Sequence, residues 1–386
     1  MVGVCIKYFH ENYGGMLQAY ATVSMLESLN LEYELIQYEK VHTILGIIKS
    51  MPRLLNGVLL NDKYEMLLKK RGLKQHPEFS ENDIARMTAF RQFKEKHFTK
   101  LSPVFKGYEE LCRGAERYLA VMTGSDQLWS PAGLPTNYYN LRFVPDGIRK
   151  ISYASSFGVK EIPWYQKKRT AEFLNRIEYI SMRENRGSEI VKELTGRDVP
   201  TILDPVFMFD MAGWEKLIPV ISEMHEPYIF AYFLGKAPEH RAAVTHAAKR
   251  LGCKIVALRH LDQYVPDDEA FGDITLYDVG PDKFLNLLRG ASYVCTDSFH
   301  GSCFSIIHQK PFVIFNRYAE NARHSKNSRI DTLCGNLGLQ ARRYDPAKEL
   351  ADQLAQPIDF DKVAVKLADL KKEADAYLKK AFEGIC

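Results

Sequence analysis

The sequence predicts an α/β protein made of two Rossmann-like domains with a cleft between them. Strand-like and helix-like segments alternate along almost the whole chain of 386 residues, which is the pattern of successive βαβ units. The alternation is broken at Asp204-Pro205, and a second alternating set begins near Tyr228. Polar loops follow several of the predicted strands, and ligands of such folds bind at these strand ends.

The first set covers residues 1–210, and we assign it to an N-terminal domain. Its expected strands are apolar runs at residues 2–6, 33–37, 118–122, 150–154, 179–182 and 201–203. A helix is expected over residues 15–29, where apolar side chains recur at helical spacing. The second domain covers residues 211–386, with strands expected at 229–233, 254–258, 293–295 and 312–315. Its final helix, residues 362–382, is expected to pack back across the first domain.

Residues 41–100 are predicted to form a basic helical insertion in the first domain. Its first part, residues 41–71, mixes apolar residues with lysines and arginines, among them Ile44, Leu55, Lys49, Arg53 and Arg71. A basic amphipathic segment could touch an anionic membrane surface. The alternative is a pair of helices packed on its own domain.

Composition restricts the partners and the compartment. The 52 basic residues nearly balance the 48 acidic ones, and a net charge of +4 argues against nucleic acid as a partner. The seven cysteines include no CxxC pair, so free thiols in a reducing compartment are expected. Neither a signal peptide nor an apolar stretch of the ~20 residues that a membrane span needs is visible. We expect a cytoplasmic protein, at the inner face of the membrane if the insertion binds there.

Neither a metal nor a cofactor is expected. No spacing of histidines, cysteines and carboxylates indicates a metal site, and no Walker or GxGxxG motif indicates a nucleotide. Asp359-Phe360-Asp361 matches a metal-binding DxD pattern, but it precedes the final helix and is interpreted as an N-cap. The sequence carries no signal for an oligomeric state.

The loop Asn12-Tyr13-Gly14-Gly15 joins the first strand to the first helix. Paired glycines let the backbone approach a ligand closely, and a helix N-terminus offers free N–H groups to an anion. The alternative is a plain tight turn.

A second polar loop, GSDQLW at residues 124–129, follows another predicted strand. Ser125, Asp126 and Gln127 could bind sugar hydroxyls, and Trp129 could cover the apolar face of a sugar ring. The alternative is a capped helix start with Trp129 in the core. A third polar loop, residues 152–158, contains Ser155 and also ends a strand.

Arg183 ends the strand at residues 179–182. An arginine there can bind a carboxylate or a phosphate through two hydrogen bonds. The alternative is a surface pair of Arg183 with Glu184, which would contribute little stability.

The segment 294–315 reads as strand, polar loop, helix and strand. Its loop, Asp297-Ser298-Phe299-His300-Gly301, places a histidine beside a serine and an aspartate at the carboxyl end of a strand. This is the position where chemistry occurs in such units. The alternative is a capping residue followed by a histidine that only packs.

Together these segments resemble the polysaccharide pyruvyltransferase family. The matching pieces lie in order from residue 12 to residue 301 and are NYGGMLQAYA, GSDQLW, SMRE, LDP and DSFHG. The resemblance implies a GT-B-like arrangement, in which two Rossmann-like domains face each other across a cleft. It also implies transfer of a pyruvyl group from phosphoenolpyruvate to a sugar or lipid-linked saccharide, forming a cyclic ketal.

The resemblance further implies roles for the loop residues. His300 is the candidate acid that protonates the vinyl carbon of the donor, and Asp126 is the candidate partner of an acceptor hydroxyl. Arg183 is the first candidate for one anionic end of the donor. The other donor-binding candidates are Asn12, Gly14, Gly15, Ser298, Gly301 and Arg329. The acceptor-binding candidates, on the N-terminal side of the cleft, are Ser125, Gln127, Trp129 and Ser155.

The chain departs from the family pattern at one position. Members with an Arg-Leu-His sequence carry a cation two residues before the histidine, whereas this chain has Ser298-Phe299-His300. Arg317, Lys326 or Arg329 would have to supply that charge.

Two other functions fit the same architecture. One is a glycosyltransferase that uses a nucleotide sugar, and the other is a non-catalytic glycan-binding protein. A glycosyltransferase would show a Gly-rich or acidic nucleotide-sugar site in the second half of the chain, and no such site is evident there.

Overall fold

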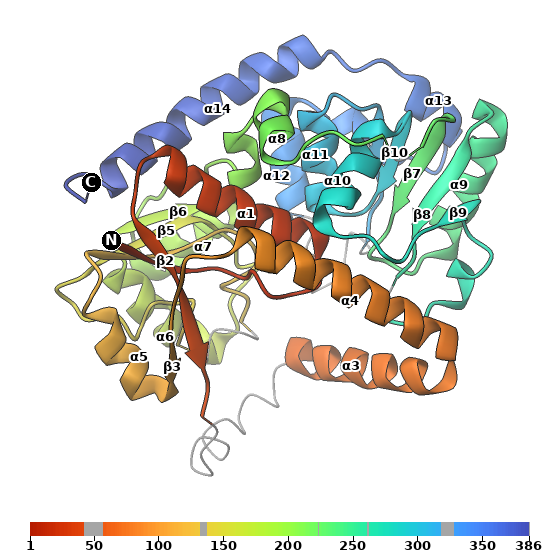
Figure 1. Ribbon diagram of the computed structural model, residues 1–386. Coiled ribbons are helices and arrows are strands. Elements are labelled where there is room, and N and C mark those ends of the chain that lie inside the picture. The colour runs from red at the N-terminus through yellow and green to blue at the C-terminus, as the bar shows by residue number, and fades with distance from the viewer. Residues whose placement is uncertain (42–56, 132–136, 223, 261, 318–327, 386) are drawn as a thin grey trace.

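The computed structural model describes residues 1–386 apart from 42–56, 132–136, 223, 261, 318–327 and 386, and the side chains of residues 57–63 also lie outside the described set (Figure 1). Two parallel β-sheets, each flanked by helices, make up the two halves of the molecule. The predicted fold class, α/β with two Rossmann-like units in a GT-B-like arrangement, is confirmed.

The first sheet has the strand order β3-β2-β1-β4-β5-β6, with every neighbouring pair parallel. Its strands are β1 (Val2–Cys5), β2 (Tyr33–Glu39), β3 (Leu101–Lys106), β4 (Ala120–Thr123), β5 (Arg149–Ser155) and β6 (Tyr179–Met182). This is the Rossmann order, and it reverses between β1 and β4. The crevice of the first half therefore opens at the carboxyl ends of these two strands.

The second sheet has the order β11-β10-β7-β8-β9, again parallel throughout. Its strands are β7 (Tyr228–Tyr232), β8 (Lys254–Leu258), β9 (Ile274–Thr275), β10 (Tyr293–Thr296) and β11 (Phe312–Ile314). The order reverses between β7 and β10, so the second half has its own crevice at the carboxyl ends of that pair.

Helices connect the strands in both halves. In the first half they are α1 (Tyr13–Ser28), α3 (Gly57–Gln75), α4 (Pro77–His97), α5 (Gly107–Ala115), α6 (Trp164–Arg176) and α7 (Asn185–Thr195). The connection to the second half contains the 3-10 helix η3 (Pro205–Met208) and α8 (Met211–Leu217). The second half contains α9 (Pro238–Leu251), η4 (Pro266–Asp268), α10 (Pro281–Gly290), α11 (Phe299–Ile307), α12 (Ser328–Leu337), η5 (Gln340–Arg342), α13 (Leu350–Ala355) and α14 (Phe360–Ala381).

The strand predicted at residues 201–203 does not form. Thr201 pairs with Met182 in a single bridge, and the chain then leaves the sheet. The reason is Asp204, whose side chain accepts a hydrogen bond from the Val206 amide at 3.1 Å and begins η3. Strands β3 and β9 were not predicted: β3 contains Pro103 and has mostly exposed side chains, and β9 has two residues.

The insertion is an antiparallel pair of helices, α3 and α4, that contacts the second half of the molecule as well as the first. Lys236 lies 3.4 Å from Glu65, and the ring of Tyr264 stacks on His76 with centroids 3.6 Å apart. Figure 1 shows α3 and α4 running from the first half toward β9. Most of the apolar residues behind the membrane interpretation lie in 42–59, outside the described side chains. Within the described chain, no helix combines the length and apolar character that a bilayer crossing requires.

The final helix, α14, returns to the first half (Figure 1). Tyr377 donates a hydrogen bond to the Ser152 carbonyl at 2.8 Å, and Arg149 donates to the Ala381 carbonyl at 3.2 Å. Asp359 accepts from the Lys362 amide at 3.1 Å and so caps this helix, as the sequence predicts. We propose residue 210, in the connection between β6 and β7, as the domain boundary.

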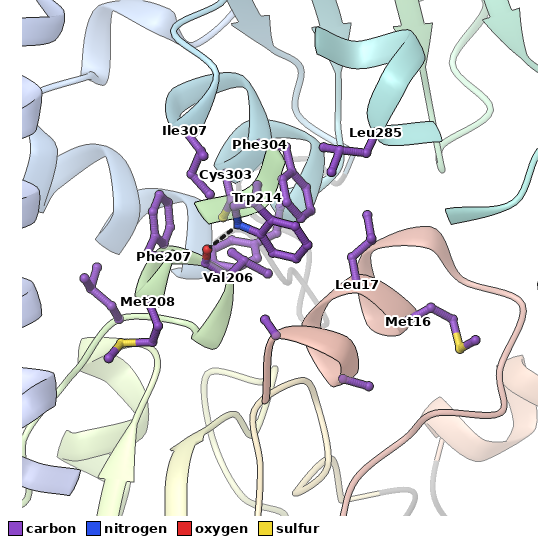
Figure 2. Packing of buried hydrophobic residues seen from close by; sticks show 14 of the residues in the cluster. Met16, Leu17, Val206, Phe207, Met208, Trp214, Leu285, Cys303, Phe304 and Ile307 are labelled. Carbon is purple, nitrogen blue, oxygen red and sulfur yellow. Dashed lines mark hydrogen bonds between the residues drawn. The ribbon is translucent and has the colours of Figure 1, made fainter. Parts of the chain in front are cut away.

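One continuous apolar core joins the two halves. It contains Leu17 of α1, Val206 of η3, Trp214 of α8 and Phe304 of α11 (Figure 2). The Trp214 side chain is fully buried, donates a hydrogen bond to the Val206 carbonyl at 2.9 Å and meets the ring of Phe304 edge to face at 4.9 Å. Because the connection between the sheets is itself part of the core, it fixes how the two crevices face each other.

We expect Trp214→Ala to lower the free energy of unfolding by about 3 to 5 kcal/mol, because it opens a cavity at this junction. The matched control is Trp164→Ala, which removes an 83% exposed side chain and should change the free energy by no more than ~0.5 kcal/mol. Urea unfolding of both variants checks this. Equal effects of the two substitutions would contradict the role of Trp214.

Candidate active site

A cavity of about 330 Å³ lies where the two crevices meet. Its walls come from the loops after the four central strands: Lys7, Asn12 and Gly15 follow β1, Asp126 and Gln127 follow β4, Leu234 follows β7, and Ser298 and His300 follow β10. These are the two strand pairs at which each sheet reverses its order, where open α/β sheets bind ligands. The sequence-predicted loops of both halves therefore form one site.

Two helices begin at this cavity. Asn12 caps α1 by accepting from the Gly15 amide at 2.9 Å, and Ser298 caps α11 by accepting from the Gly301 amide at 3.3 Å. Each cap leaves other first-turn N–H groups without an intrahelical partner, which favours an anion at this point. Gly301 itself packs against β10, because a Cβ there would lie 2.8 Å from Thr296 Oγ1.

His300 is held between the two halves of the molecule. Its side chain is 7% exposed, and its Nε2 atom faces the Asp204 carboxylate at 3.5 Å. On the other side, a Cβ at Gly14 would lie only 2.4 Å from His300 Nδ1. Gly14 is therefore required so that the imidazole can rest against the backbone of α1, whereas a Cβ at Gly15 would meet no atom closer than 3.5 Å.

Asp204 is the buried charge on which this arrangement is built. Its side chain is fully buried and accepts hydrogen bonds from Ser125 Oγ at 2.7 Å and Arg183 Nη1 at 2.8 Å. Burial would raise the pKa of the Asp204 carboxyl, but the hydrogen bonds and charges of His300 and Arg183 outweigh it and hold that pKa well below its usual range. Asp204 is therefore ionised, and it faces Arg183 of the first half and His300 of the second.

Arg183 lies behind the cavity rather than in its wall. Its side chain is 1% exposed, and its guanidinium pairs with Asp204 and stacks over the ring of Phe299 at 4.7 Å. The alternative of a surface pair with Glu184 is wrong, because Glu184 is buried and accepts from Ser156 Oγ at 2.9 Å. Arg183 therefore contacts Asp204 and Phe299, not the cavity itself.

Arg329 and Arg317 bring positive charge to the cavity wall. The guanidinium of Arg329 lies over the ring of Phe299 at 5.5 Å, and its Nε has no hydrogen-bond partner among the described residues. Burial and the nearby charge of Arg183 lower the pKa of Arg329 to about 10, so it stays protonated at neutral pH. Arg317 donates to the Asp297 carbonyl at 3.1 Å.

Arg317 and Arg329 are two of the three candidates for the cation that this chain lacks at Ser298. Both line the same cavity as His300, although Arg317 also lies 3.4 Å from the Asp297 carboxylate. The third candidate, Lys326, lies outside the described residues. Lys7 also lines the cavity and was not predicted, although its position directly after β1 could have indicated it.

Asp126 lines the same cavity. Its backbone has a positive φ of 73°, which is uncommon for a residue other than glycine and turns the loop sharply after β4. Burial would raise the pKa of its carboxyl, but the charges of Lys7, Arg183 and His300 lower it well below the usual range. The carboxylate is thus ionised and suited to accept a hydrogen bond. Gln127 beside it has a buried amide nitrogen with no partner in the described chain.

The other predicted acceptor residues do not reach the cavity. Trp129 is fully buried between the rings of Phe157 and Phe173, with centroids 5.4 and 5.3 Å away, so the alternative of a core tryptophan is correct. Ser155 is also buried and donates to the Gly124 carbonyl at 3.2 Å. Ser125 is buried, and its hydroxyl donates a hydrogen bond to Asp204.

The comparison with known proteins identifies the family. A model of the polysaccharide pyruvyl transferases matches residues 12–318, which is most of the chain. The chain belongs to the polysaccharide pyruvyl transferase family. Membership of this family assigns the chain a transferase activity in polysaccharide biosynthesis. The search of curated proteins returned no match.

Solved structures share the fold of this pyruvyl transferase family member. A protein from Listeria monocytogenes assigned as UDP-N-acetylglucosamine 2-epimerase is 12% identical, with 100% of this chain and 97% of that chain covered and a TM-score of 0.54. UDP-GlcNAc 2-epimerase from Neisseria meningitidis, bound to UDP-GlcNAc, is 9% identical, with 98% and 99% covered and a TM-score of 0.51. At these identities the likeness shows the fold alone.

We expect Asp204→Asn to destabilise the protein in a pH-dependent way. The folded-state pKa of Asp204 lies below its unfolded value, so its stabilisation is present above about pH 4 and is lost as the pH falls further. At pH 7 the variant should lose about 3 kcal/mol, because the buried Arg183 loses its nearest counter-charge and keeps only the more distant carboxylate of Asp126, at 3.8 Å.

Unfolding measured between pH 7 and pH 3 checks this, and the difference from wild type should shrink toward the acid end. Asp146→Asn, which changes an 89% exposed carboxylate paired with Arg176, is the control and should have little effect at any pH. A difference that stays constant with pH would contradict the assignment of the ionised form.

Proposed function

We propose that the protein transfers a pyruvyl group from phosphoenolpyruvate to a saccharide acceptor, forms a pyruvate ketal and releases phosphate. The observation that carries the proposal is the juxtaposition of His300 with Arg329 and Arg317 in one cavity between the two Rossmann-like units. Membership of the family supports pyruvyl transfer in general, and the chemistry of this cavity supports the particular donor.

The donor carries a carboxylate and a phosphate, so it needs several positive groups. Arg329, Arg317 and Lys7 line the cavity, and the first turns of α1 and α11 add N–H groups that favour an anion. We assign the anionic ends of phosphoenolpyruvate to these groups. Arg183 contributes indirectly, because its guanidinium holds Asp204 and the Phe299 ring on which Arg329 rests.

His300 is the proposed acid. Its Nε2 faces the ionised Asp204, which leaves Nδ1, on the edge beside Gly14, as the nitrogen that exchanges a proton with the donor. Transfer of this proton to the vinyl carbon makes a methyl group and an oxocarbenium-like centre at the neighbouring carbon. Positive charge develops at this oxocarbenium-like carbon. The donor's own carboxylate and the ionised side chain of Asp126 are the negative groups proposed to stabilise it.

Two acceptor hydroxyls complete the reaction. The first attacks the oxocarbenium-like carbon and gives its proton to His300, which thereby returns to its protonated form. The second attacks the same carbon, and phosphate leaves with the remaining proton, so one ketal and one phosphate result. Asp126, ionised and exposed to the cavity, is positioned to accept a hydrogen bond from an acceptor hydroxyl, with Gln127 beside it.

The proposal is tested by thermal shift and by phosphate release. Phosphoenolpyruvate should stabilise the wild-type protein, and phosphate should appear only when a saccharide acceptor is added. Arg329→Met should raise the KM for phosphoenolpyruvate at least about tenfold, because it removes a charge-assisted contact. His300→Ala should mainly lower kcat, by about a hundredfold or more.

Two exposed residues provide matched controls, Arg169→Met and His246→Ala, and both should behave as wild type. The proposed donor is wrong if UDP- or GDP-sugars stabilise the protein and phosphoenolpyruvate does not. Unchanged turnover of His300→Ala would exclude the acid role while leaving the donor in place.

A further inference from the structure

Helix α3 packs on the rest of the protein through one side. On that side a Cβ at Gly72 would lie 3.0 Å from the Tyr264 side chain, and Lys69 pairs with Asp83 of α4 at 2.8 Å. Figure 1 shows α3 on the outer side of α4, away from both sheets. The opposite side of α3 therefore faces away from the described chain.

This opposite side, the outer face of α3, combines apolar side chains with cations. Its residues recur every three or four positions, the spacing that places side chains on one side of a helix. They are Tyr64, Met66, Leu67, Lys70, Arg71 and Lys74. The three apolar side chains are 58%, 61% and 65% exposed, in that order. A cluster of large apolar side chains at this exposure is typical of an interaction surface.

The charge on the outer face is positive only. Lys70, Arg71 and Lys74 are exposed, and none of them forms an ion pair with a carboxylate of the described chain. The carboxylate of Glu65 is turned instead toward the second half of the molecule, where it pairs with Lys236 at 3.4 Å. A partner of this face must therefore offer both negative charge and an apolar environment.

The surface of an anionic bilayer has both properties. A helix that lies in the membrane interface buries its apolar side chains at the boundary of head groups and acyl chains, while its lysines and arginines bind lipid phosphates. A nucleic acid would engage the cations but would leave the apolar side chains in water. The sequence that precedes the outer face has the same character, since residues 41–61 contain no aspartate or glutamate.

We propose that the outer face of α3 docks the protein on the anionic surface of a phospholipid bilayer. The three apolar side chains enter the interface, and the three cations bind the phosphates of the head groups. The helix lies on the bilayer and does not cross it. This inference goes beyond the proposed function, because docking requires neither the donor nor the acceptor.

Helix α4 connects the docking face to the first cavity. Its residue Arg86 is 6% exposed, donates a hydrogen bond to the Glu11 carbonyl and lies 3.4 Å from Asp262. Both Glu11 and Asp262 line the first cavity. A protein docked through α3 therefore holds this cavity in a fixed position relative to the membrane surface.

Cosedimentation of the full-length protein with phospholipid vesicles tests the docking. The protein should bind vesicles of phosphatidylcholine mixed with phosphatidylglycerol but not vesicles of phosphatidylcholine alone, and added salt should release it. Combining Lys70→Ala with Lys74→Ala should weaken binding about twentyfold, because one lysine near such a surface contributes about fivefold in affinity. Leu67→Ser should weaken binding about fivefold or more, because it removes an apolar side chain from the interface.

Matched controls lie on α14. Lys379→Ala combined with Lys380→Ala removes two exposed lysines, and Val365→Ser changes a side chain that is exposed to the same fraction as Leu67. Both controls should bind anionic vesicles as wild type does. Absence of binding to these vesicles, or α3 variants that bind as tightly as wild type, would overturn the inference.

Light scattering distinguishes the membrane from a second copy of the chain. A wild-type dimer that Leu67→Ser converts to monomers would show that the outer face is a subunit interface, and it would also overturn the docking. Vesicle binding is measured without phosphoenolpyruvate. Failure of the docking would therefore leave the proposed function intact, and failure of phosphate release would leave the docking intact.

Discussion

The site depends on one buried carboxylate. Asp204 is fully enclosed where the first half of the chain ends, and it is ionised because Arg183 and Ser125 of the first half and His300 of the second surround it. A buried charge of this kind is tolerated only when its partners are in place. The proposed acid of the reaction therefore has its orientation set by a residue from the opposite half of the molecule.

The same constraint explains why the glycine loop matters. His300 can reach Asp204 only because Gly14 lets the imidazole press against the start of α1. His300 belongs to α11 in the second half of the molecule. Two residues of the first half, Gly14 and Asp204, nevertheless lie on either side of its imidazole. Helix α4 adds a second brace, since Arg86 joins the loop after β1 to the loop after β8. The two crevices meet in a fixed geometry, which the apolar core around Trp214 maintains.

Much of this could be predicted from the sequence, because strand ends at a topological switch point face a ligand whatever the details of packing. That argument placed Asn12, Asp126, Ser298 and His300 correctly on the cavity wall. Side-chain direction was not predictable in this way. Trp129 follows the same strand as Asp126 but turns into the core, because Phe157 and Phe173 offer it an apolar contact that no sequence pattern reveals.

Long-range pairing accounts for the remaining differences. Arg183 looked like a ligand-binding cation by position, yet it is paired with Asp204, 21 residues away in the chain. The two arginines of the cavity wall, Arg317 and Arg329, belong to segments whose distance from His300 only the fold determines. Similarly, no local pattern indicates that Arg86 of α4, in the insertion, contacts Asp262 in the loop after β8.

The most direct test of this account is a crystal structure of the protein with phosphoenolpyruvate. The account predicts the donor in the cavity between the two halves, with its anionic groups on Arg329, Arg317 and the start of α11, and its vinyl carbon facing His300. A donor bound elsewhere, or one whose vinyl carbon points away from His300, would contradict it.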